Sequence, residues 1–263
     1  MTPGLRASAS GMQAQQLRID TIANNLANVS TTGFKRSRAS FEDMLYETLQ
    51  GAKQVDYQGA QSLAPIQIGR GVRLAAIDRV DSQGTIETTN RPFDLAIEGD
   101  GYFQIQMPDG STNYTRDGNF RLSDSGTLVT ESGYEVMPPI TVPADSTNFT
   151  VSPTGVVSVT VGQSGTPQEI GQLELVRFAN PSGLTNKGGN LFGANVNSGD
   201  PMSGSPNQDG YGQIVQNSLE SSNVEIVQEM VDMITAQRAY EVNSKAIKTA
   251  DDMISTVTDE LIR

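Results

Sequence analysis

The chain of 263 residues contains no cysteine and no histidine. It therefore lacks the thiol and imidazole groups that serve as nucleophiles, general bases and zinc ligands, and it cannot form a disulfide. No stretch of about 18 apolar residues occurs, so we expect no membrane-spanning helix. The net charge of −12 argues against binding to nucleic acid or to an anionic membrane surface.

Nothing in the sequence marks an active site. The Asp-Gly and Asp-Ser-Gly segments do not have the ligand spacing of a calcium loop, and Gly69-Arg70-Gly71 lacks the third glycine and the helix of a dinucleotide site. We therefore expect no enzyme activity, no cofactor, no metal site and no small-molecule substrate. The first residues carry no apolar segment of the kind found in signal peptides, so we expect no cleaved signal peptide.

Residues 222–263 have the pattern of one long helix. Ser222 and Glu225 stand at capping-box spacing, and no proline or glycine follows them. Apolar side chains then recur at steps of three, four and seven: Ile226, Met230, Met233, Tyr240, Ile247, Ile254 and Leu261. At about 1.5 Å per residue the helix would be roughly 57 Å long, longer than a compact domain can cover. Its apolar stripe needs a partner, either elsewhere in the chain or on another copy.

Residues 3–28 have the pattern of a second amphipathic helix. Thr2 can cap it, and Pro3 stands at the favoured first position. Its apolar residues are spaced by seven: Leu5, Met12, Ile19 and Leu26. We expect this helix to pair with the C-terminal one, and an ordinary packing of two helices within one globule remains the alternative. The helix should end in a polar turn around Asn24, Asn25 and Asn28, before Gly33 and Phe34.

The middle of the chain has the alternating pattern of β-strands. Between residues 99 and 133, turn sequences such as Pro108-Asp109-Gly110 recur every seven to nine residues, which predicts an antiparallel meander. The fold class is therefore α+β, with long N- and C-terminal helices packed as a coiled-coil-like pair and an antiparallel β-rich middle domain. The expected parts are a terminal helix and exit motif (1–34), an extended or hairpin segment (35–68), a β-rich domain (69–205), a linker (206–221) and the C-terminal helix (222–263).

Several motifs resemble those of one known family. Near the N-terminus stand Ala23-Asn24-Asn25-Leu26-Ala27-Asn28 and Thr32-Gly33-Phe34-Lys35, and near the C-terminus Gln237-Arg238-Ala239-Tyr240-Glu241 and Asn243-Ser244-Lys245. Between them lie Tyr114-Thr115-Arg116-Asp117-Gly118-Asn119-Phe120 and Gly171-Gln172-Leu173. Together they are similar to the bacterial flagellar rod and hook family over nearly the whole chain, and most similar to its distal-rod subunits.

The resemblance implies a structural subunit that self-assembles helically into the flagellar distal rod, a rigid tubular shaft that transmits torque from motor to hook. The implied partners are other copies of the chain, proximal-rod proteins below, the hook protein above and the surrounding outer rings. The implied location is the rod of the basal body, which spans the periplasm, reached by the flagellar type III export route.

The resemblance also implies two sets of contact residues. The self-assembly interface would consist of the apolar residues of both helices listed above, together with Asn24, Asn25, Asn28 and Phe34. A distal-rod insertion at residues 47–68 would stiffen the tube between subunits, and it contains Gln50, Val55, Tyr57 and Leu63.

Two alternatives remain open at the level of sequence. Within the family, the chain could be a hook or a proximal-rod subunit. Outside it, a secreted β-rich carbohydrate hydrolase or adhesin with helical ends would fit the same composition, since a glycosidase needs only two carboxylates.

Overall fold

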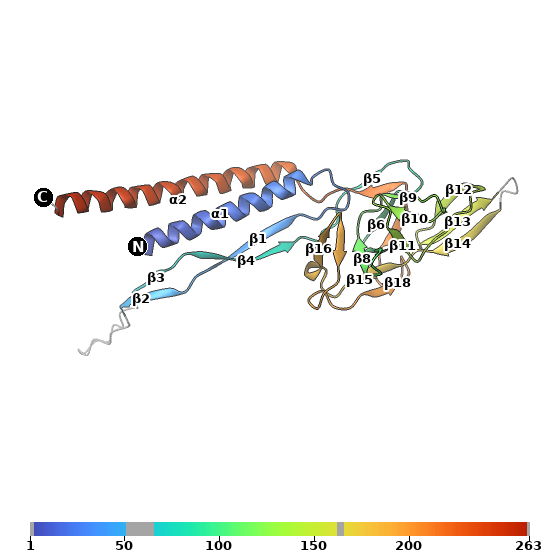
Figure 1. Cartoon of the computed structure of the whole chain (residues 1–263), viewed down its shortest axis with the longest axis horizontal. Coiled ribbons are helices and arrows are strands. Elements are labelled where there is room, and N and C mark those ends of the chain that lie inside the picture. Colours follow the sequence, from blue (N-terminus) through green and yellow to red (C-terminus); the bar gives the residue numbers. More distant parts are fainter. Residues whose placement is uncertain (1–2, 51–65, 162–165, 262–263) are drawn as a thin grey trace, which may run out of the picture. The chain divides into compact units, whose positions relative to one another are not determined.

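The fold is α+β, with one helix near each end of the chain and a β-rich middle (Figure 1). A computed structural model describes residues 3–50, 66–161 and 166–261. The chain forms two compact units, and each combines stretches that are far apart in the sequence. The helical unit comprises Met1–Leu26, Ser37–Asp78 and Glu225–Arg263, and the β-rich unit comprises Ala27–Arg36 and Arg79–Val224.

The described residues of the helical unit form two helices and four strands. Helix α1 spans Pro3–Ala27 and helix α2 spans Ile226–Leu261. The strands pair as two ribbons, β1 with β4 and β2 with β3, with these bounds: β1 Ser37–Asp43, β2 Tyr46–Gln50, β3 Ile66–Gly69 and β4 Val72–Arg79.

The two helices lie side by side and run antiparallel (Figure 1). The Asn25 amide donates to Glu229 Oε2 at 3.1 Å, and Arg18 Nη2 lies 3.2 Å from Asp232 Oδ1. At Gly11 a Cβ atom would come within 3.0 Å of the Asn243 amide. Residues with lower numbers in α1 therefore contact residues with higher numbers in α2.

The contact face of each helix consists of small and polar residues. Ala14 of α1 is buried, and so are Glu229 and Ala236 of α2. Asn243 and Ala250 continue this face of α2 at intervals of seven and are half-buried. Small side chains allow close approach of two helices but bury little apolar area, so this pairing contributes modest stability.

Ribbon β1–β4 is attached to α1 by side chains of that helix. Asn25 Oδ1 accepts from Ser37 N and its amide donates to Ser37 O, each at 2.8 Å, as a paired strand would. Ser10 Oγ accepts from Val72 N at 3.2 Å. Gly71 has φ +111° and passes so close to Ser10 that no larger residue fits. Small residues on α1 thus allow both α2 and the start of β4 to pack closely against that helix.

The β-rich unit is built from antiparallel strands. Its largest sheet has the order β16-β17-β8-β7-β11-β10-β9, and a second has the order β12-β13-β14. Three further pairs are β19 with β6, β20 with β5 and β15 with β18. The bounds are β5 Ile86–Thr88, β6 Leu95–Glu98, β7 Phe103–Gln106, β8 Thr112–Thr115, β9 Phe120–Leu122, β10 Leu128–Thr130, β11 Glu135–Met137, β12 Ser146–Val151, β13 Val156–Val161, β14 Pro167–Gln172, β15 Leu175–Arg177, the 3₁₀ turn η2 Pro181–Gly183, β16 Thr185–Gly188, β17 Leu191–Gly193, β18 Met202–Gly204, β19 Gln213–Gln216 and β20 Ser218–Glu220.

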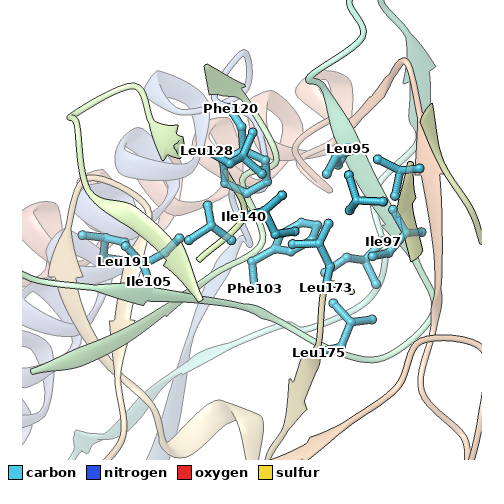
Figure 2. Packing of buried hydrophobic residues seen from close by; sticks show 14 residues of the cluster. Leu95, Ile97, Phe103, Ile105, Phe120, Leu128, Ile140, Leu173, Leu175 and Leu191 are labelled. Atoms are coloured by element: carbon cyan, nitrogen blue, oxygen red, sulfur yellow. The ribbon is translucent and has the colours of Figure 1, made fainter. Parts of the chain in front are cut away.

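The core of this unit lies between its sheets (Figure 2). Phe103 and Phe120 meet edge to face, with ring centroids 5.1 Å apart, and both are fully buried. Aliphatic side chains from strands or loops distant in sequence surround them, among them Leu95, Ile105, Leu128, Ile140 and Leu173. Each such side chain contributes about 1.5–3 kcal/mol when it leaves water, which is why this unit has its own stable interior.

Three of the predicted turns join paired strands, whereas the turns at 99–101 and 116–118 connect β6 with β7 and β8 with β9, which do not pair. Gly110 (φ +81°) closes the turn between β7 and β8, Gly126 (φ +78°) that between β9 and β10, and Gly133 (φ +86°) that between β10 and β11. Gly118 is needed for a different reason, because a Cβ there would overlap the carbonyl oxygen of Leu95.

Two boundaries differ from the sequence-based expectation. The range expected as a linker, 206–221, contains β19 and β20, because Ile214 is buried in the core and these strands pair with β6 and β5. Helix α2 begins at Ile226 and not at Ser222. Ser222 Oγ accepts from Val224 N instead, while the Asn223 side chain is held by backbone groups of the β-rich unit.

Candidate functional site

Helix α2 carries an apolar patch that nothing in the described chain covers. Five aliphatic side chains near its start are about half exposed or more: Ile226 47%, Val227 70%, Met230 51%, Val231 50% and Ile234 48%. Since residues four apart are neighbours on a helix, they form two adjacent rows on one side. We call these five residues the α2 patch. Exposed apolar area of this kind on a single helix is typical of a protein–protein contact surface.

The other predicted interface residues of α2 are placed as follows. Tyr240 and Ile254 are exposed, at 39% and 46%. Met233 and Ile247 are half-buried beside the contact with α1. Leu261 is the last residue of the helix.

The predicted interface residues of α1 are only half-buried. Leu5, Met12, Ile19 and Leu26 belong to this class, whereas Ala14 and Ile22 are buried. The apolar stripe that repeats every seven residues is therefore not the innermost face of α1.

The asparagines at the end of α1 divide into two kinds. Asn25 is 1% exposed, and its amide is used within the chain by Ser37 and Glu229. Asn24 is exposed, and Asn28 and Phe34 are half-buried. In the expected stiffening segment, Gln50 ends β2, while Val55, Tyr57 and Leu63 lie outside the described residues.

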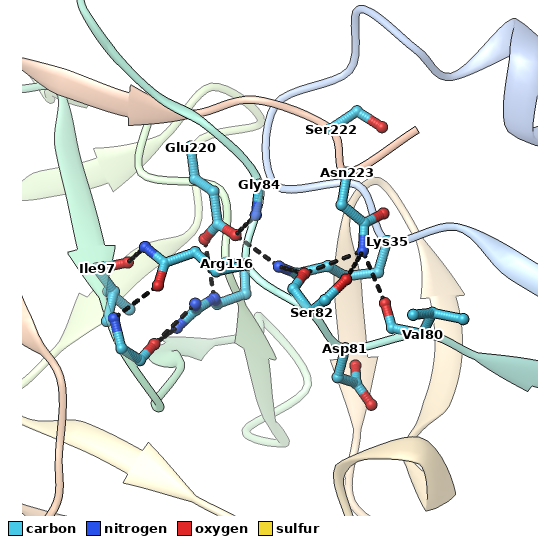
Figure 3. A network of polar contacts seen from close by, with 12 residues as sticks. Lys35, Val80, Asp81, Ser82, Gly84, Ile97, Arg116, Glu220, Ser222 and Asn223 are labelled. Atoms are coloured by element: carbon cyan, nitrogen blue, oxygen red, sulfur yellow. Dashed lines mark hydrogen bonds and ion pairs between the residues drawn. The ribbon is translucent and has the colours of Figure 1, made fainter. Parts of the chain in front are cut away.

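A buried ionic cluster occupies one end of the β-rich unit (Figure 3). Glu220 Oε1 lies 2.5 Å from Lys35 Nζ, and Glu220 Oε2 lies 3.0 Å from Arg116 Nε. The side chains of all three residues are at most 5% exposed. Gly84 N also donates to Glu220 Oε1, at 2.9 Å. We call Lys35, Arg116 and Glu220 the Glu220 cluster.

The two cations of the cluster are held in place by backbone carbonyls. Lys35 Nζ donates to Ser82 O at 2.8 Å. Arg116 donates to Gly99 O at 2.8 Å and to Gly101 O at 2.6 Å. Burial lowers the pKa of Lys35, and the Glu220 carboxylate opposes this effect. The carboxylate therefore compensates two charges that would otherwise be costly in the protein interior.

Sequence reasoning missed the role of this cluster. Lys35 and Arg116 lie in the motifs 32–35 and 114–120, but the sequence assigns them no partner. Glu220 is 185 positions from Lys35, and no local pattern reveals such a pairing. It also missed Val227, Val231 and Ile234 of the α2 patch, although Val227 and Val231 are four residues apart next to the predicted stripe.

The described part of the chain contains neither a set of metal ligands nor a membrane-spanning helix. Across residues 3–50, 66–161 and 166–261, no three acidic side chains gather into a set that could ligate a metal ion. Neither of the two helices, as far as they are described, has the length and apolarity needed to cross a bilayer.

Three family models match successive parts of the chain. Residues 5–35 match the model described as flagella basal body rod protein. Residues 96–159 match the flagellar hook protein FlgE/F/G D1 domain, and residues 215–260 match the C-terminal part of flagellar basal body rod FlgEFG proteins. The first match contains most of α1, the third contains most of α2, and the second lies in the β-rich unit.

Similar proteins extend over almost the full length. The chain is 47% identical to flagellar basal-body rod protein FlgG of Borreliella burgdorferi over 256 residues, which is 97% of each chain. It is 41% identical to the FlgG of Bacillus subtilis over 266 residues, which is 98% of this chain and 99% of that protein. Flagellar hook protein FlgE of Helicobacter mustelae is 45% identical over 137 residues, but this match covers 52% of the present chain and 30% of the hook protein.

Replacing the carboxylate of the cluster should be more harmful than replacing its lysine. Glu220→Gln leaves Lys35 and Arg116 buried without a counter-charge, so we expect a loss of about 3–5 kcal/mol in the free energy of unfolding. Lys35→Met leaves Glu220 with Arg116 and Gly84 N, and should cost about 1–3 kcal/mol. Denaturant unfolding of the full chain measures both values. Equal losses, or a larger loss for Lys35→Met, would contradict the central place of Glu220.

Tyr102 should make the β-rich unit sensitive to strongly alkaline conditions. Burial raises the pKa of Tyr102 from its usual value near 10 to about 12, and Arg79 partly opposes the shift. A pKa raised by folding means that the neutral phenol stabilises the fold below pH 10, and that this contribution is lost between pH 10 and 12. Tyr102→Phe should therefore weaken the fall in stability over this range. Thermal unfolding at several pH values tests this, and identical alkaline profiles would refute it.

Proposed function

Since this chain belongs to the flagellar basal-body rod protein family, which it matches along almost its whole length, we propose that its helical unit joins one copy to the next. The chain is a structural subunit of the flagellar distal rod, and it is not an enzyme. The match to a hook protein covers only half of the chain, which favours the rod over the hook.

The exposed α2 patch is the observation that supports self-assembly most strongly. A helix that packs only within its own chain would turn Ile226, Met230 and Ile234 inward. Here the buried positions of α2 are Glu229 and Ala236, and the five side chains of the α2 patch are about half exposed or more. Covering them would yield about 25 cal/mol for each Å² of apolar area removed from water. Among the other predicted interface residues, Tyr240 and Ile254 are exposed, whereas Asn25 is buried within the chain.

The pairing of α1 and α2 belongs to the same proposal. We propose that the two helices keep their antiparallel arrangement in the rod as a coiled-coil-like pair. Asn25, Arg18 and Gly11 hold them in register through Glu229, Asp232 and Asn243. Because this pair buries few apolar groups, its stability in the rod comes mainly from neighbouring copies, which cover its outer faces.

Growth into a rod requires a particular kind of contact. If the α2 patch met the same patch of a second copy, the result would be a closed dimer. A patch that meets a different surface of the next copy, with a rotation that does not close, gives an open helical polymer. The proposed assembly is of this second kind, and axial helices packed in it would carry torque along the shaft.

The position of the subunit follows from the same family assignment. We propose that proximal-rod proteins lie below it, the hook protein above it and the outer rings around it. The subunit would reach this place by the flagellar type III route. The shared match to the hook-protein D1 model supports a common building plan for adjacent segments of the shaft.

We propose a separate role for residues 47–68, which is to stiffen the rod. Strands β2 and β3 form a two-stranded ribbon on which Leu45, Tyr46, Ile66 and Ile68 are exposed. An isolated ribbon of two strands is marginally stable in water. We propose that this ribbon and residues 51–65 contact neighbouring subunits and restrict sliding between them, which makes the rod straight and stiff.

A charge in the α2 patch should prevent assembly without unfolding the chain. Met230→Asp places a carboxylate in the proposed contact, whereas Gln228→Asp adds the same charge on an exposed polar side of the helix two residues away. Both lie near the helix N-terminus, where a negative charge is favourable, so the helix itself should persist. We expect Met230→Asp to abolish the polymer and Gln228→Asp to retain it, as measured by light scattering and electron microscopy. Normal polymer from Met230→Asp would exclude the α2 patch from the interface.

Removal of the insertion should change the stiffness of the polymer and not its formation. Deleting residues 50–64 leaves both helices intact, so copies should still assemble. Without the added contacts between subunits, the tube should be curved or flexible. Electron micrographs of the deletion variant decide the matter, because straight tubes of unchanged stiffness would show that the segment has no such role.

A further inference from the structure

The Glu220 cluster belongs to the β-rich unit, and it connects the segments of that unit that are next in sequence to the crossings into the helical unit. The chain crosses from one unit to the other four times, after Leu26, Arg36, Asp78 and Val224. In the β-rich unit the segments next to these crossings are 27–36, 79–84 and 220–224. Lys35, Ser82, Gly84 and Glu220 bring all three of these segments together at one carboxylate (Figure 3).

Backbone groups reinforce the junction on both sides of the cluster. Gly33 N donates to Glu220 O and Val80 N donates to Arg36 O, each at 2.8 Å. The Asn223 side chain accepts from Arg36 N at 2.7 Å and donates to Val80 O at 2.8 Å. A single site within the β-rich unit thus connects the three segments through which the chain enters or leaves that unit.

We propose that the Glu220 cluster is a mechanical clasp that carries force between the crossing segments and spares the β-rich unit. The direct link from Lys35 to Glu220 bridges 185 positions of sequence. Force that enters through residues 27–36 can leave through residues 220–224 across this link, without passing through the strands in between. Arg116 anchors the same carboxylate to the body of the unit through Gly99 O and Gly101 O.

An ion pair suits this task for a physical reason. Hydrogen bonds and ion pairs act over short distances and in fixed directions, so they resist a small displacement more sharply than apolar contacts do. Burial excludes the water that would otherwise replace a broken bond. Lys35 and Glu220 therefore hold their two segments in a fixed position relative to each other. The proposal rests on the rod function for its biological use, because a rotating shaft loads every subunit.

Pulling on single chains tests the clasp independently of polymer formation. The chain has no cysteine, so Ser30→Cys and Glu225→Cys provide unique attachment points on exposed residues that flank the clasp. The rate of the first rupture at constant force is then measured with and without Lys35→Met. We expect this rate to rise about tenfold or more, which corresponds to about 1.4 kcal/mol. Lys35→Arg, which keeps the positive charge, should restore most of the resistance.

The control is a variant that weakens the same unit elsewhere. Val157 is fully buried in β13, away from the cluster, so Val157→Ala should lower the thermal stability of the unit. It should leave the rate of first rupture unchanged. If Val157→Ala accelerates rupture as much as Lys35→Met, or if Lys35→Met has no effect, the cluster contributes only to stability and the clasp is refuted. Chains that resist force normally but do not polymerise would count against the proposed rod function alone.

Discussion

The β-rich unit depends on one buried carboxylate. Glu220 forms ion pairs with Lys35 and Arg116 and accepts a hydrogen bond from Gly84 N. These groups come from segments that are widely separated in the sequence. Burying two cations is unfavourable unless a charge of opposite sign lies against them, and Glu220 is that charge. This arrangement holds residues 32–36, 80–84 and 220–223 together within the β-rich unit.

The helical unit is governed by a different constraint. Its two helices approach each other through Gly11, Ala14, Ala236 and Asn243, which are small or polar. This leaves the aliphatic side chains of the α2 patch exposed, and no described part of the chain covers them. In the proposed assembly, neighbouring copies would bury this surface and add to the stability of the helices. Incomplete burial in the monomer is therefore a property that favours growth of a polymer.

The sequence predicted the elements well and their contacts less well. The spacing of apolar residues revealed both helices, although the predicted capping box at Ser222 and Glu225 did not mark the start of α2. Glycines such as Gly110 and Gly126 marked turns that join paired strands. Period alone could not decide which face of α2 meets α1, because Ala236 and Asn243 repeat with the same spacing as the apolar residues. Small residues lie on the inner face because they permit close approach. The pairing of Lys35 with Glu220 could not be predicted, since it is fixed only when the β-rich unit has folded.

The central claim is that copies of this chain cover the outer face of α2. Reconstruction of the assembled polymer by electron cryo-microscopy tests this claim most directly, since it shows the surroundings of each side chain. The account predicts that Met230, Val231 and Ile234 contact a neighbouring copy, while Ala236 remains against α1 of its own chain. A polymer in which these three side chains face solvent, or in which Ala236 contacts a different copy, would contradict it.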